Sequence, residues 1–216
     1  VDVDRFTPAL RNPALRAVWG VQPGERVLLY VGRLAPEKNL ELLAAAFDAM
    51  RAVQPGWRLV VGGDGPQRAW LAQRCPQAVL LGALAGEPLA QAYANGDLLA
   101  FPSLTETFGN VTLEALASGL PVLAFDYAAA AEVVRHGDSG LLAPVGDAEA
   151  YLQLARTVAA DEALLQRLRS GAVHAVQHLG WGRIVEQVES IWLRLLAAHA
   201  AGPAVVRSSP WWDGLP

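Results

Sequence analysis

The chain has 216 residues, of which 53% are hydrophobic and 18% are charged, and its formal net charge at pH 7 is −4. This length and composition are typical of a globular protein with a full core, and they exclude an intrinsically disordered chain. The negative charge argues against non-specific nucleic-acid binding, and the single cysteine, Cys75, excludes an internal disulfide bond.

Short, continuous apolar runs follow one another along the chain and are separated by helical patterns. Such runs are typical of strands that are buried on both faces of a sheet. The predicted strands are residues 26–32, 57–65, 78–82, 97–103, 121–125 and 140–147. The predicted helices between them are residues 39–53, 66–75, 87–95 and 110–119, and the last helix is expected to end at Gly119.

After the last predicted strand the pattern becomes wholly helical. One face of the segment 184–196 carries Ile184, Val188, Ile191, Trp192 and Leu195. Strands that alternate with helices predict right-handed βαβ units and a mostly parallel sheet. We therefore predict an α/β fold with one Rossmann-like, doubly wound domain over residues 1–200. The tryptophan-containing tail, residues 201–216, is predicted to be irregular, although docking on another domain or on a membrane is an open alternative.

In a sheet of this kind, ligands bind beyond the carboxyl ends of the strands. Arg33 and Lys38 lie in the loop after the first predicted strand, in the motif "GRLAPEKN". Two cations there can neutralise a diphosphate, or they can be solvated loop residues with Glu37 paired to one of them. The motif "GGDGP" after the second strand fits neither the dinucleotide-binding pattern nor the P-loop, and a tight turn explains it better.

A second motif, "TETFGNVTLEALASG", places Glu106 in a loop and Glu114 in the helix that follows, with Gly109 between them. The start of a helix offers free backbone N–H groups and suits a phosphate. Carboxylates beside a phosphate are better suited to sugar hydroxyls, so the motif suggests a nucleotide-sugar site. The alternative is that Glu114 favours the helix start and that Glu106 caps it.

Four segments in this order together resemble the family-four retaining glycosyltransferases: "YVGRLAPEKNLELL", "VVGGDGP", "LLAFPSLTETFGNVTLEALASGLPVLA" and "AEVVRHGDSGLL". The similarity extends over about residues 1–160. Members of that family have the GT-B fold, in which two Rossmann-like domains face each other across a cleft. The resemblance implies that this chain is one half of a GT-B enzyme, the C-terminal donor-binding half. The acceptor site would lie on a missing N-terminal domain.

The resemblance also implies roles for individual residues. Arg33 and Lys38 would bind the donor diphosphate and stabilise its charge during transfer. Glu106 would contact the donor sugar near the reacting carbon, and Glu114 would hold the nucleotide ribose. The remaining donor-site residues would be Gly32, Phe108, Gly109, Asn110 and Val111.

One loop departs from the family pattern. After the predicted strand 121–125 the family often has a glycine-containing loop, whereas this chain has "DYAAAAEVV". Tyr127 would line the sugar pocket or cover it. Glu132 matches an acid of the family, although an acid at a helix start would account for it equally well. His136 is expected to be a surface loop residue.

The implied reaction transfers a hexosyl group from a nucleotide-diphosphate sugar to an acceptor hydroxyl with retention of configuration. Neither a metal nor a cofactor is expected, because cations and helix amides would stabilise the leaving diphosphate. Two alternatives stay open. One is a nucleotide-sugar epimerase on the same fold, and the other is a non-catalytic module that binds a nucleotide or a partner protein.

The sequence also bears on location. No apolar run approaches the roughly 20 residues of a membrane-spanning helix, and the first residues do not have the pattern of a signal peptide. We expect a cytoplasmic protein. Peripheral contact of the whole enzyme with the inner face of a membrane is an open alternative.

Overall fold

The computed structural model describes residues 1–200, and the tail predicted at 201–216 lies outside the described residues. The chain divides into two compact units, Val1–Gly180 and a second unit that begins at Trp181. The predicted domain of residues 1–200 thus holds all of the first unit and part of the second.

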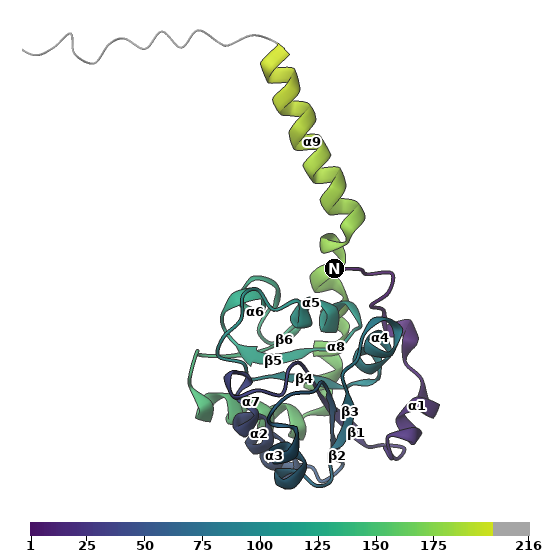
Figure 1. Ribbon diagram of the computed structural model, residues 1–216, viewed down its shortest axis with the longest axis vertical. Helices are drawn as coiled ribbons and strands as arrows, with labels where there is room; N and C mark the ends of the chain where they lie inside the picture. The colour runs from purple at the N-terminus through teal and green to yellow at the C-terminus, as the bar shows by residue number, and fades with distance from the viewer. Residues whose placement is uncertain (201–216) are drawn as a thin grey trace, which may run out of the picture. The chain divides into compact units, whose positions relative to one another are not determined.

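The first unit is built on a six-stranded sheet (Figure 1). Its strands are β1 (Arg26–Val31), β2 (Trp57–Gly62), β3 (Val79–Gly82), β4 (Leu98–Phe101), β5 (Val122–Phe125) and β6 (Gly140–Ala143). Their order is β3-β2-β1-β4-β5-β6, and every neighbouring pair is parallel. This order confirms the predicted Rossmann-like, doubly wound sheet and places the switch in strand order between β1 and β4.

Helices pack against both faces of the sheet. The helices of the first unit are η1 (Pro8–Leu10), α1 (Pro13–Val18), η2 (Pro36–Lys38), α2 (Leu40–Val53), α3 (Arg68–Arg74), α4 (Gly86–Asn95), α5 (Asn110–Ala117), α6 (Ala128–Val133), α7 (Ala148–Ala160), α8 (Glu162–Val176) and η3 (Gln177–Leu179). Along β1, Leu28 and Tyr30 join a hydrophobic cluster with α2 and α7, whereas Leu29 and Val31 join a second cluster with α4 and α5. Because successive side chains of a strand point to opposite faces, burial on both faces explains the continuous apolar runs.

All six predicted strands are longer than the observed ones, three of them by a single residue and three by more. β2 ends at Gly62 rather than at residue 65, β4 ends at Phe101 rather than at 103, and β6 ends at Ala143 rather than at 147. After β2 the cause is Gly63 (φ 151°), where a Cβ atom would lie 1.9 Å from the carbonyl oxygen of Gly32. The "GGDGP" motif is therefore a tight turn that lets the loops after β1 and β2 pack against each other.

The predicted end of α5 at Gly119 is two residues too late, although Gly119 takes part in ending the helix. The helix itself ends at Ala117 with Ser118 as its C-cap, and Gly119 follows in the left-handed conformation (φ 70°). The N–H of Gly119 donates to the carbonyl oxygen of Leu116 at 3.0 Å, and the N–H of Leu120 donates to that of Ala115 at 2.9 Å. These two bonds satisfy carbonyl groups that the helix end would otherwise leave unpaired.

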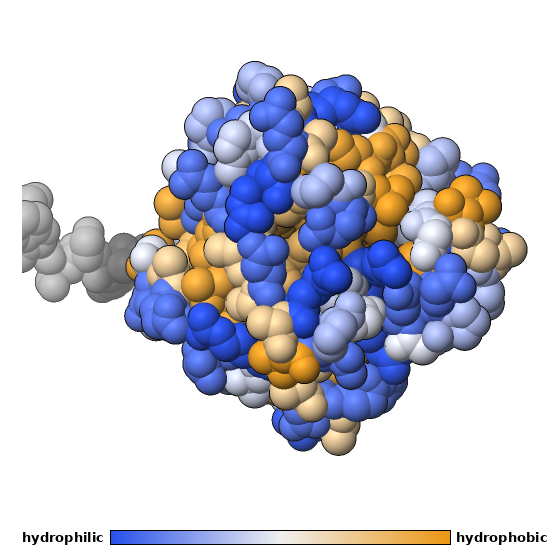
Figure 2. Space-filling view, turned by 90° about the horizontal axis from the view of Figure 1, so that it is seen from below, coloured by the Kyte–Doolittle hydropathy of each residue, from blue (hydrophilic) through white to orange (hydrophobic). Residues whose placement is uncertain are grey.

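Hydrophilic side chains cover most of the face shown in Figure 2, with hydrophobic ones in smaller patches. Most large hydrophobic side chains of the first unit are buried in the two clusters, and the exposed ones are Val18, Val53, Leu104, Phe108 and Val145. Single exposed hydrophobic residues are ordinary for a globular protein.

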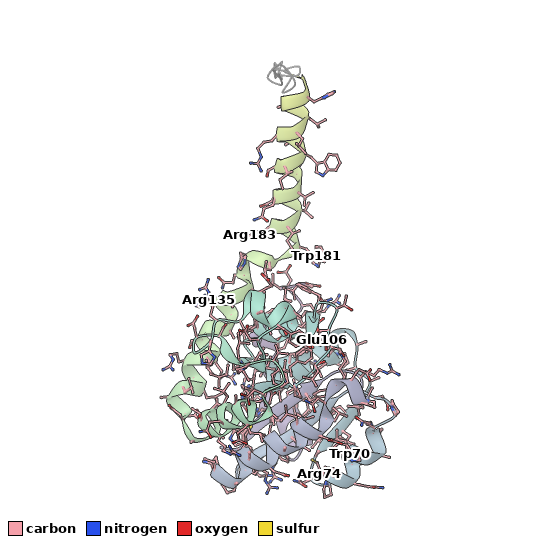
Figure 3. The ribbon with its side chains drawn as sticks, turned by 90° about the vertical axis from the view of Figure 1, so that its left-hand side faces the viewer. Trp70, Arg74, Glu106, Arg135, Trp181 and Arg183 are labelled. Atoms are coloured by element: carbon pink, nitrogen blue, oxygen red, sulfur yellow. The ribbon has the colours of Figure 1, made fainter. Side chains whose placement is uncertain are left out.

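The loop between β4 and α5, which carries Glu106, begins at the carboxyl end of β4. In Figure 3, Glu106 lies well apart from Trp70 and Arg74 of α3. The loop is therefore at the edge of the sheet where the sequence predicts a ligand.

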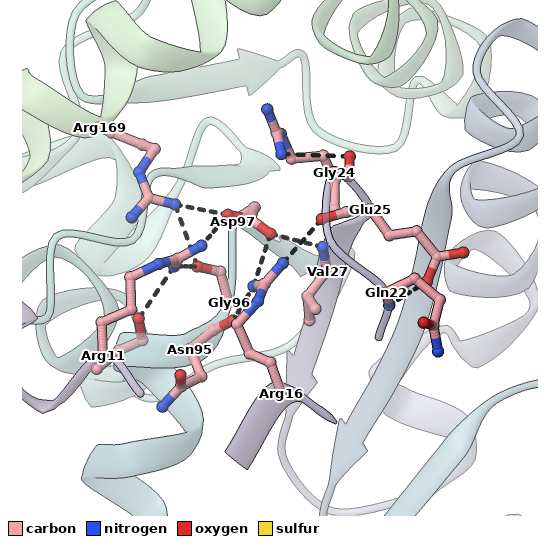
Figure 4. A network of polar contacts seen from close by, with 12 residues as sticks. Arg11, Arg16, Gln22, Gly24, Glu25, Val27, Asn95, Gly96, Asp97 and Arg169 are labelled. Carbon is pink, nitrogen blue, oxygen red and sulfur yellow. Dashed lines mark hydrogen bonds and ion pairs between the residues drawn. The ribbon is translucent and has the colours of Figure 1, made fainter. Parts of the chain in front are cut away.

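A buried ionic cluster lies at the other edge, where the strands begin. Asp97 immediately precedes β4, and its side chain is only 3% exposed. Its carboxylate accepts hydrogen bonds from Arg11 at 2.6 Å, from Arg16 at 2.9 Å and from Arg169 at 2.8 Å (Figure 4). The backbone N–H of Val27 donates a fourth at 2.7 Å. This Asp97 cluster joins the N-terminal segment, α1 and α8 to the beginnings of β1 and β4.

The loop that departs from the family pattern contains a strained residue. Ala128, the first residue of α6, has a φ of 50°, which lies in the left-handed region. A residue with a Cβ atom is destabilised there by about 1–2 kcal/mol, whereas glycine is not. The alanine thus occupies a backbone conformation that suits the glycine expected in this loop.

Replacement of Ala128 by glycine is expected to stabilise the domain by roughly 0.5–1 kcal/mol, because relief of the strain exceeds the added flexibility of the unfolded chain. Urea unfolding would measure the change. The matched control is Ala131→Gly in the same helix, which should destabilise by up to about 1 kcal/mol. Equal destabilisation by both substitutions would contradict the proposed strain.

The described part of the second unit is the single helix α9 (Trp181–Ala200). It is amphipathic as predicted. Ile184 is half-buried, but most of the other hydrophobic side chains are exposed, namely Trp181, Val185, Val188, Ile191, Trp192, Leu193, Leu195 and Leu196. In the described residues no helix is long and apolar enough to cross a membrane.

Candidate functional site

A cleft of about 330 Å³ opens at the carboxyl ends of β1 and β2, between the loops after those strands and helices α4 and α5. Four of the residues predicted for a donor site line it: Gly32, Arg33, Val111 and Glu114. Most of the other lining side chains are aliphatic, including Leu84 and Leu89. The cleft thus combines an apolar floor with a few polar groups, which is typical of a small-molecule site.

Glu114 projects from the middle of α5 and reaches this cleft. The hydroxyl of Tyr93, on α4, donates a hydrogen bond to its Oε2 at 2.8 Å. Burial raises the pKa of the Glu114 carboxyl, and the bond from Tyr93 partly offsets that rise. The first turn of α5 contains no acidic residue, so Glu114 is not explained as a helix-start residue.

Glu106 pairs with Lys38. The Lys38 ammonium, at the end of η2, contacts Oε1 of Glu106, and it lies 3.5 Å from the carbonyl oxygen of Thr105. Both side chains are largely buried, at 19% and 13% exposure. Two residues predicted on separate loops are therefore in direct contact. Within residues 1–200 no backbone N–H at the start of α5 donates a hydrogen bond to the Glu106 carboxylate, so the capping alternative is wrong.

Lys38 is also distinctive in composition, because the 17 basic residues of the chain are one lysine and 16 arginines. Lysine and arginine differ chemically: the ammonium is a compact point charge, whereas the guanidinium is a planar fork. An otherwise arginine-only chain thus has its single lysine at the candidate site. That count is a sequence signal that would have singled out Lys38 without any family resemblance.

Arg33 has the environment that the alternative interpretation describes. Its guanidinium lies 3.7 Å from the carboxylate of Glu37, and its side chain is 68% exposed. Glu37 thus pairs with one of the two cations, as the alternative of solvated loop residues states. Lys38 pairs with Glu106 instead. Exposed pairs of this kind contribute little to stability, so Arg33 is free to exchange Glu37 for an anionic ligand.

The loop between β4 and α5 supplies the other predicted residues. Gly109 is the N-cap of α5 with a φ of 96°, and Asn110 and Val111 begin the helix. The side chain of Phe108 is exposed, and its carbonyl oxygen accepts a hydrogen bond from the N–H of Ala129 at 2.8 Å. Phe108 also borders a wider groove of about 660 Å³ beside α6.

Three tyrosine hydroxyls donate hydrogen bonds to residues around the site. Of these tyrosines, Tyr30 and Tyr93 have no role in the sequence-based prediction. Tyr30 donates to the carbonyl oxygen of Arg33 at 3.0 Å, and Tyr93 donates to Glu114. Tyr127, predicted to line or cover a sugar pocket, donates to the carbonyl oxygen of Ser103 at 2.9 Å. Its hydroxyl thus holds the β4–α5 loop in place.

Glu132 and His136 lie in and after helix α6. Glu132 is the fifth residue of the six-residue helix α6, so it is not a helix-start acid. His136 is an exposed loop residue, as predicted, and its Nδ1 accepts a hydrogen bond from the N–H of Leu142 at 3.1 Å. Residues 1–200 contain no group of three or more His, Cys, Asp or Glu side chains that could hold a metal ion.

A second cavity, of about 160 Å³, lies near the beginnings of β1 and β2. It is lined by Arg26, Trp57 and Glu162 among others, and none of the predicted site residues reaches it. Its place at the amino ends of the strands disagrees with the rule for ligand binding in open parallel sheets, so the cleft at Glu114 is the candidate site.

Comparisons with known proteins identify the family and the fold of this chain. A sequence model of the family "Glycosyl transferases group 1" matches residues 25–161. A GDP-mannose-dependent alpha-mannosyltransferase of Mycobacterium tuberculosis is 44% identical over 149 residues, which is 69% of this chain and 38% of that protein. The sulfoquinovosyl transferase SQD2 of Arabidopsis thaliana is 32% identical over 216 residues, covering 94% of this chain and 42% of that protein.

A solved structure shows the same architecture. Anabaena Alr3699/HepE in complex with UDP-glucose matches with a TM-score of 0.73 and 26% identity, over 90% of this chain and 56% of that one. The sheet order and the cleft define a Rossmann-like α/β domain with the fold of one half of a GT-B glycosyltransferase. The chain belongs to the glycosyl transferases group 1 family. It spans less than half the length of the two curated relatives.

Proposed function

We propose that this chain is the donor-binding half of a glycosyltransferase that uses a nucleotide-diphosphate sugar. The observation that carries the proposal is the convergence of Glu114, Arg33 and Gly32 on one cleft at the strand ends. The Lys38–Glu106 pair does not line this cleft, but it joins the loops that follow β1 and β4 at the same edge of the sheet. The relative named for GDP-mannose and the solved structure bound to UDP-glucose support a donor of this class.

Each polar group has a task in this proposal. The Glu114 carboxylate accepts hydrogen bonds from the ribose hydroxyls, and Arg33 and Lys38 neutralise the diphosphate. The N–H groups at the start of α5, from Gly109 to Val111, add the positive end of the helix dipole. Glu106 leaves Lys38 when the diphosphate binds and contacts the donor sugar. No residue of this set needs to hold a metal or a cofactor.

In the proposed reaction, an acceptor hydroxyl attacks the anomeric carbon on the face from which the diphosphate departs. The bond between that carbon and the diphosphate oxygen breaks, the new glycosidic bond forms with retained configuration, and the acceptor proton passes to the departing phosphate. Lys38, Arg33 and the helix amides stabilise the charge that develops on the leaving group. Glu106 orients the sugar during this step.

The acceptor site belongs to an N-terminal domain in this proposal, and the donor-binding half alone is inactive in transfer. The basis is the length of the relatives, of which this chain covers 38% and 42%. The predicted cytoplasmic location, with or without contact of the whole enzyme with a membrane face, is part of the proposal. An epimerase is disfavoured by the family assignment.

Isothermal titration calorimetry of the chain against GDP-mannose, UDP-glucose and ADP-glucose tests donor binding. We expect selective binding of one donor, weakened roughly tenfold or more by Lys38→Ala and by Glu114→Ala, because each removes hydrogen bonds to a charged group. The control is Glu41→Ala on α2, an exposed acid that does not line the cleft. Equal affinity in all variants would contradict the assigned site.

A transfer assay of the full-length protein separates an enzyme from a non-catalytic module. The proposal expects turnover of the donor that binds most tightly. Donor binding without transfer to any hydroxyl acceptor and without donor hydrolysis would favour the module.

A further inference from the structure

The partner of Glu114 in the cleft is a buried phenol. Tyr93 lies on the inner side of α4, its side chain is fully buried, and it lines the same cleft as Glu114. Its ring meets that of Phe6 edge to face, with the centroids 5.8 Å apart and the planes at 76°. Within residues 1–200, its hydroxyl makes the one hydrogen bond to the Glu114 carboxylate. The phenol is thus fixed by packing at one end and aimed at the carboxylate at the other.

We propose that Tyr93 is a positioning residue for the donor, one that holds the Glu114 carboxylate in place and in its charged form for the ribose hydroxyls. This inference rests on the proposed function and adds a residue to it. A carboxylate has about four acceptor positions on its two oxygens, so one bond from Tyr93 leaves enough for two sugar hydroxyls. The bond removes the freedom of the side chain to rotate before the donor arrives.

The hydrogen bond from Tyr93 also affects the charge of Glu114. Burial raises the pKa of this carboxyl and favours the neutral form, which accepts fewer hydrogen bonds. The bond from Tyr93 lowers the pKa, and the amino group of Val1 lowers it to a lesser degree. The other charged groups at the cleft are Arg33 and Asp64. Burial raises the pKa of Tyr93 well above its ordinary value, so its hydroxyl stays protonated and remains a donor.

The direction of the pH effect follows from these shifts. Donor binding needs the anionic Glu114, so affinity is present above the pKa of this carboxyl and is lost as the pH falls through it. Removal of the Tyr93 hydroxyl raises that pKa further. In a Tyr93→Phe variant, acid should therefore weaken donor binding at a higher pH than in the wild type.

The test is calorimetry of wild type and Tyr93→Phe with the donor that binds the wild type, at several pH values. We expect a loss of affinity of roughly tenfold at neutral pH, with the acid limb of the profile moved to higher pH. The phenylalanine keeps the ring and its packing on Phe6. The matched control is Tyr151→Phe on α7, which removes a buried hydroxyl bonded to the carbonyl oxygen of Leu123 at 3.0 Å.

The outcomes separate the two proposals. If Tyr93→Phe lowers the melting temperature as Tyr151→Phe does but leaves the affinity and its pH profile unchanged, Tyr93 is structural and the inference is overturned. If the pH dependence of donor affinity shifts to higher pH in Tyr93→Phe but not in Tyr151→Phe, the inference holds. If the wild type itself binds no nucleotide sugar, the proposed function fails first, and the positioning role fails with it.

Discussion

Replacement of Asp97 by asparagine is expected to destabilise the domain by about 3–5 kcal/mol, which is a large part of the 5–15 kcal/mol typical of a folded domain. The substitution keeps the shape of the side chain but removes the charge that balances Arg11, Arg16 and Arg169. Three guanidinium groups then face one another around a buried site without an anion. The melting temperature should fall by roughly 6–20 °C.

The same cluster predicts a loss of stability in acid. Burial raises the pKa of Asp97, but the attraction of Arg11 and Arg16, the Val27 N–H and Arg169 together lower it below its ordinary value. A carboxyl with a lowered pKa stabilises the fold above its unfolded pKa, and this contribution disappears as the pH falls through the folded pKa. The Asp97→Asn variant should lack that part of the acid dependence.

Chemical unfolding at neutral and acidic pH measures both effects. The matched control is Asp48→Asn, which breaks an exposed pair with Arg74 on the surface and should cost less than about 1 kcal/mol. If Asp97→Asn is no more destabilising than Asp48→Asn, the Asp97 cluster does not contribute to stability as expected.

Replacement of Glu106 by glutamine in the full-length enzyme is expected to reduce turnover by about 100-fold or more. The amide cannot provide the negative charge that the proposal places beside the reacting sugar. Donor affinity should change far less, because the substitution also frees Lys38 from its resting ion pair and leaves it available to the diphosphate. Steady-state kinetics would measure the turnover of this variant, and calorimetry would measure its affinity for the donor.

A matched control for this change is Glu87→Gln on α4, an exposed acid whose carboxylate accepts a hydrogen bond from Gln91. It should leave turnover unchanged. Full activity of Glu106→Gln would remove Glu106 from the mechanism, and an equal loss of affinity and turnover would make it a binding residue only.

Much of the fold could be predicted because its signal is local. The six strands are mostly apolar runs, and the helices between them repeat with a helical period, so a parallel sheet follows from general rules. The strand ends were harder to predict, because pairing with neighbours decides where a strand stops. Gly63, for example, ends β2 through close packing on Gly32, which lies far away in the sequence.

The site could be predicted in part for the same reason. Glu106 and Glu114 stand out because they flank a glycine at a helix start, and the loop after β1 is an expected ligand position. The contacts that organise the site join residues distant in sequence, such as Lys38 to Glu106 across 68 positions and Tyr93 to Glu114 across 21. No local pattern encodes such pairs. In the sequence, Tyr93 is an ordinary apolar position of α4. Its contact with Glu114 forms only because the fold places α5 beside α4.

A crystal structure of the chain with the donor that binds most tightly would show directly whether Glu114 holds the ribose. We expect the ribose hydroxyls within about 2.6–3.2 Å of the Glu114 carboxylate oxygens, with the diphosphate in contact with Arg33 and Lys38. A nucleotide bound elsewhere, such as in the cavity beside Trp57, with Glu114 still in contact with Tyr93 alone, would contradict it.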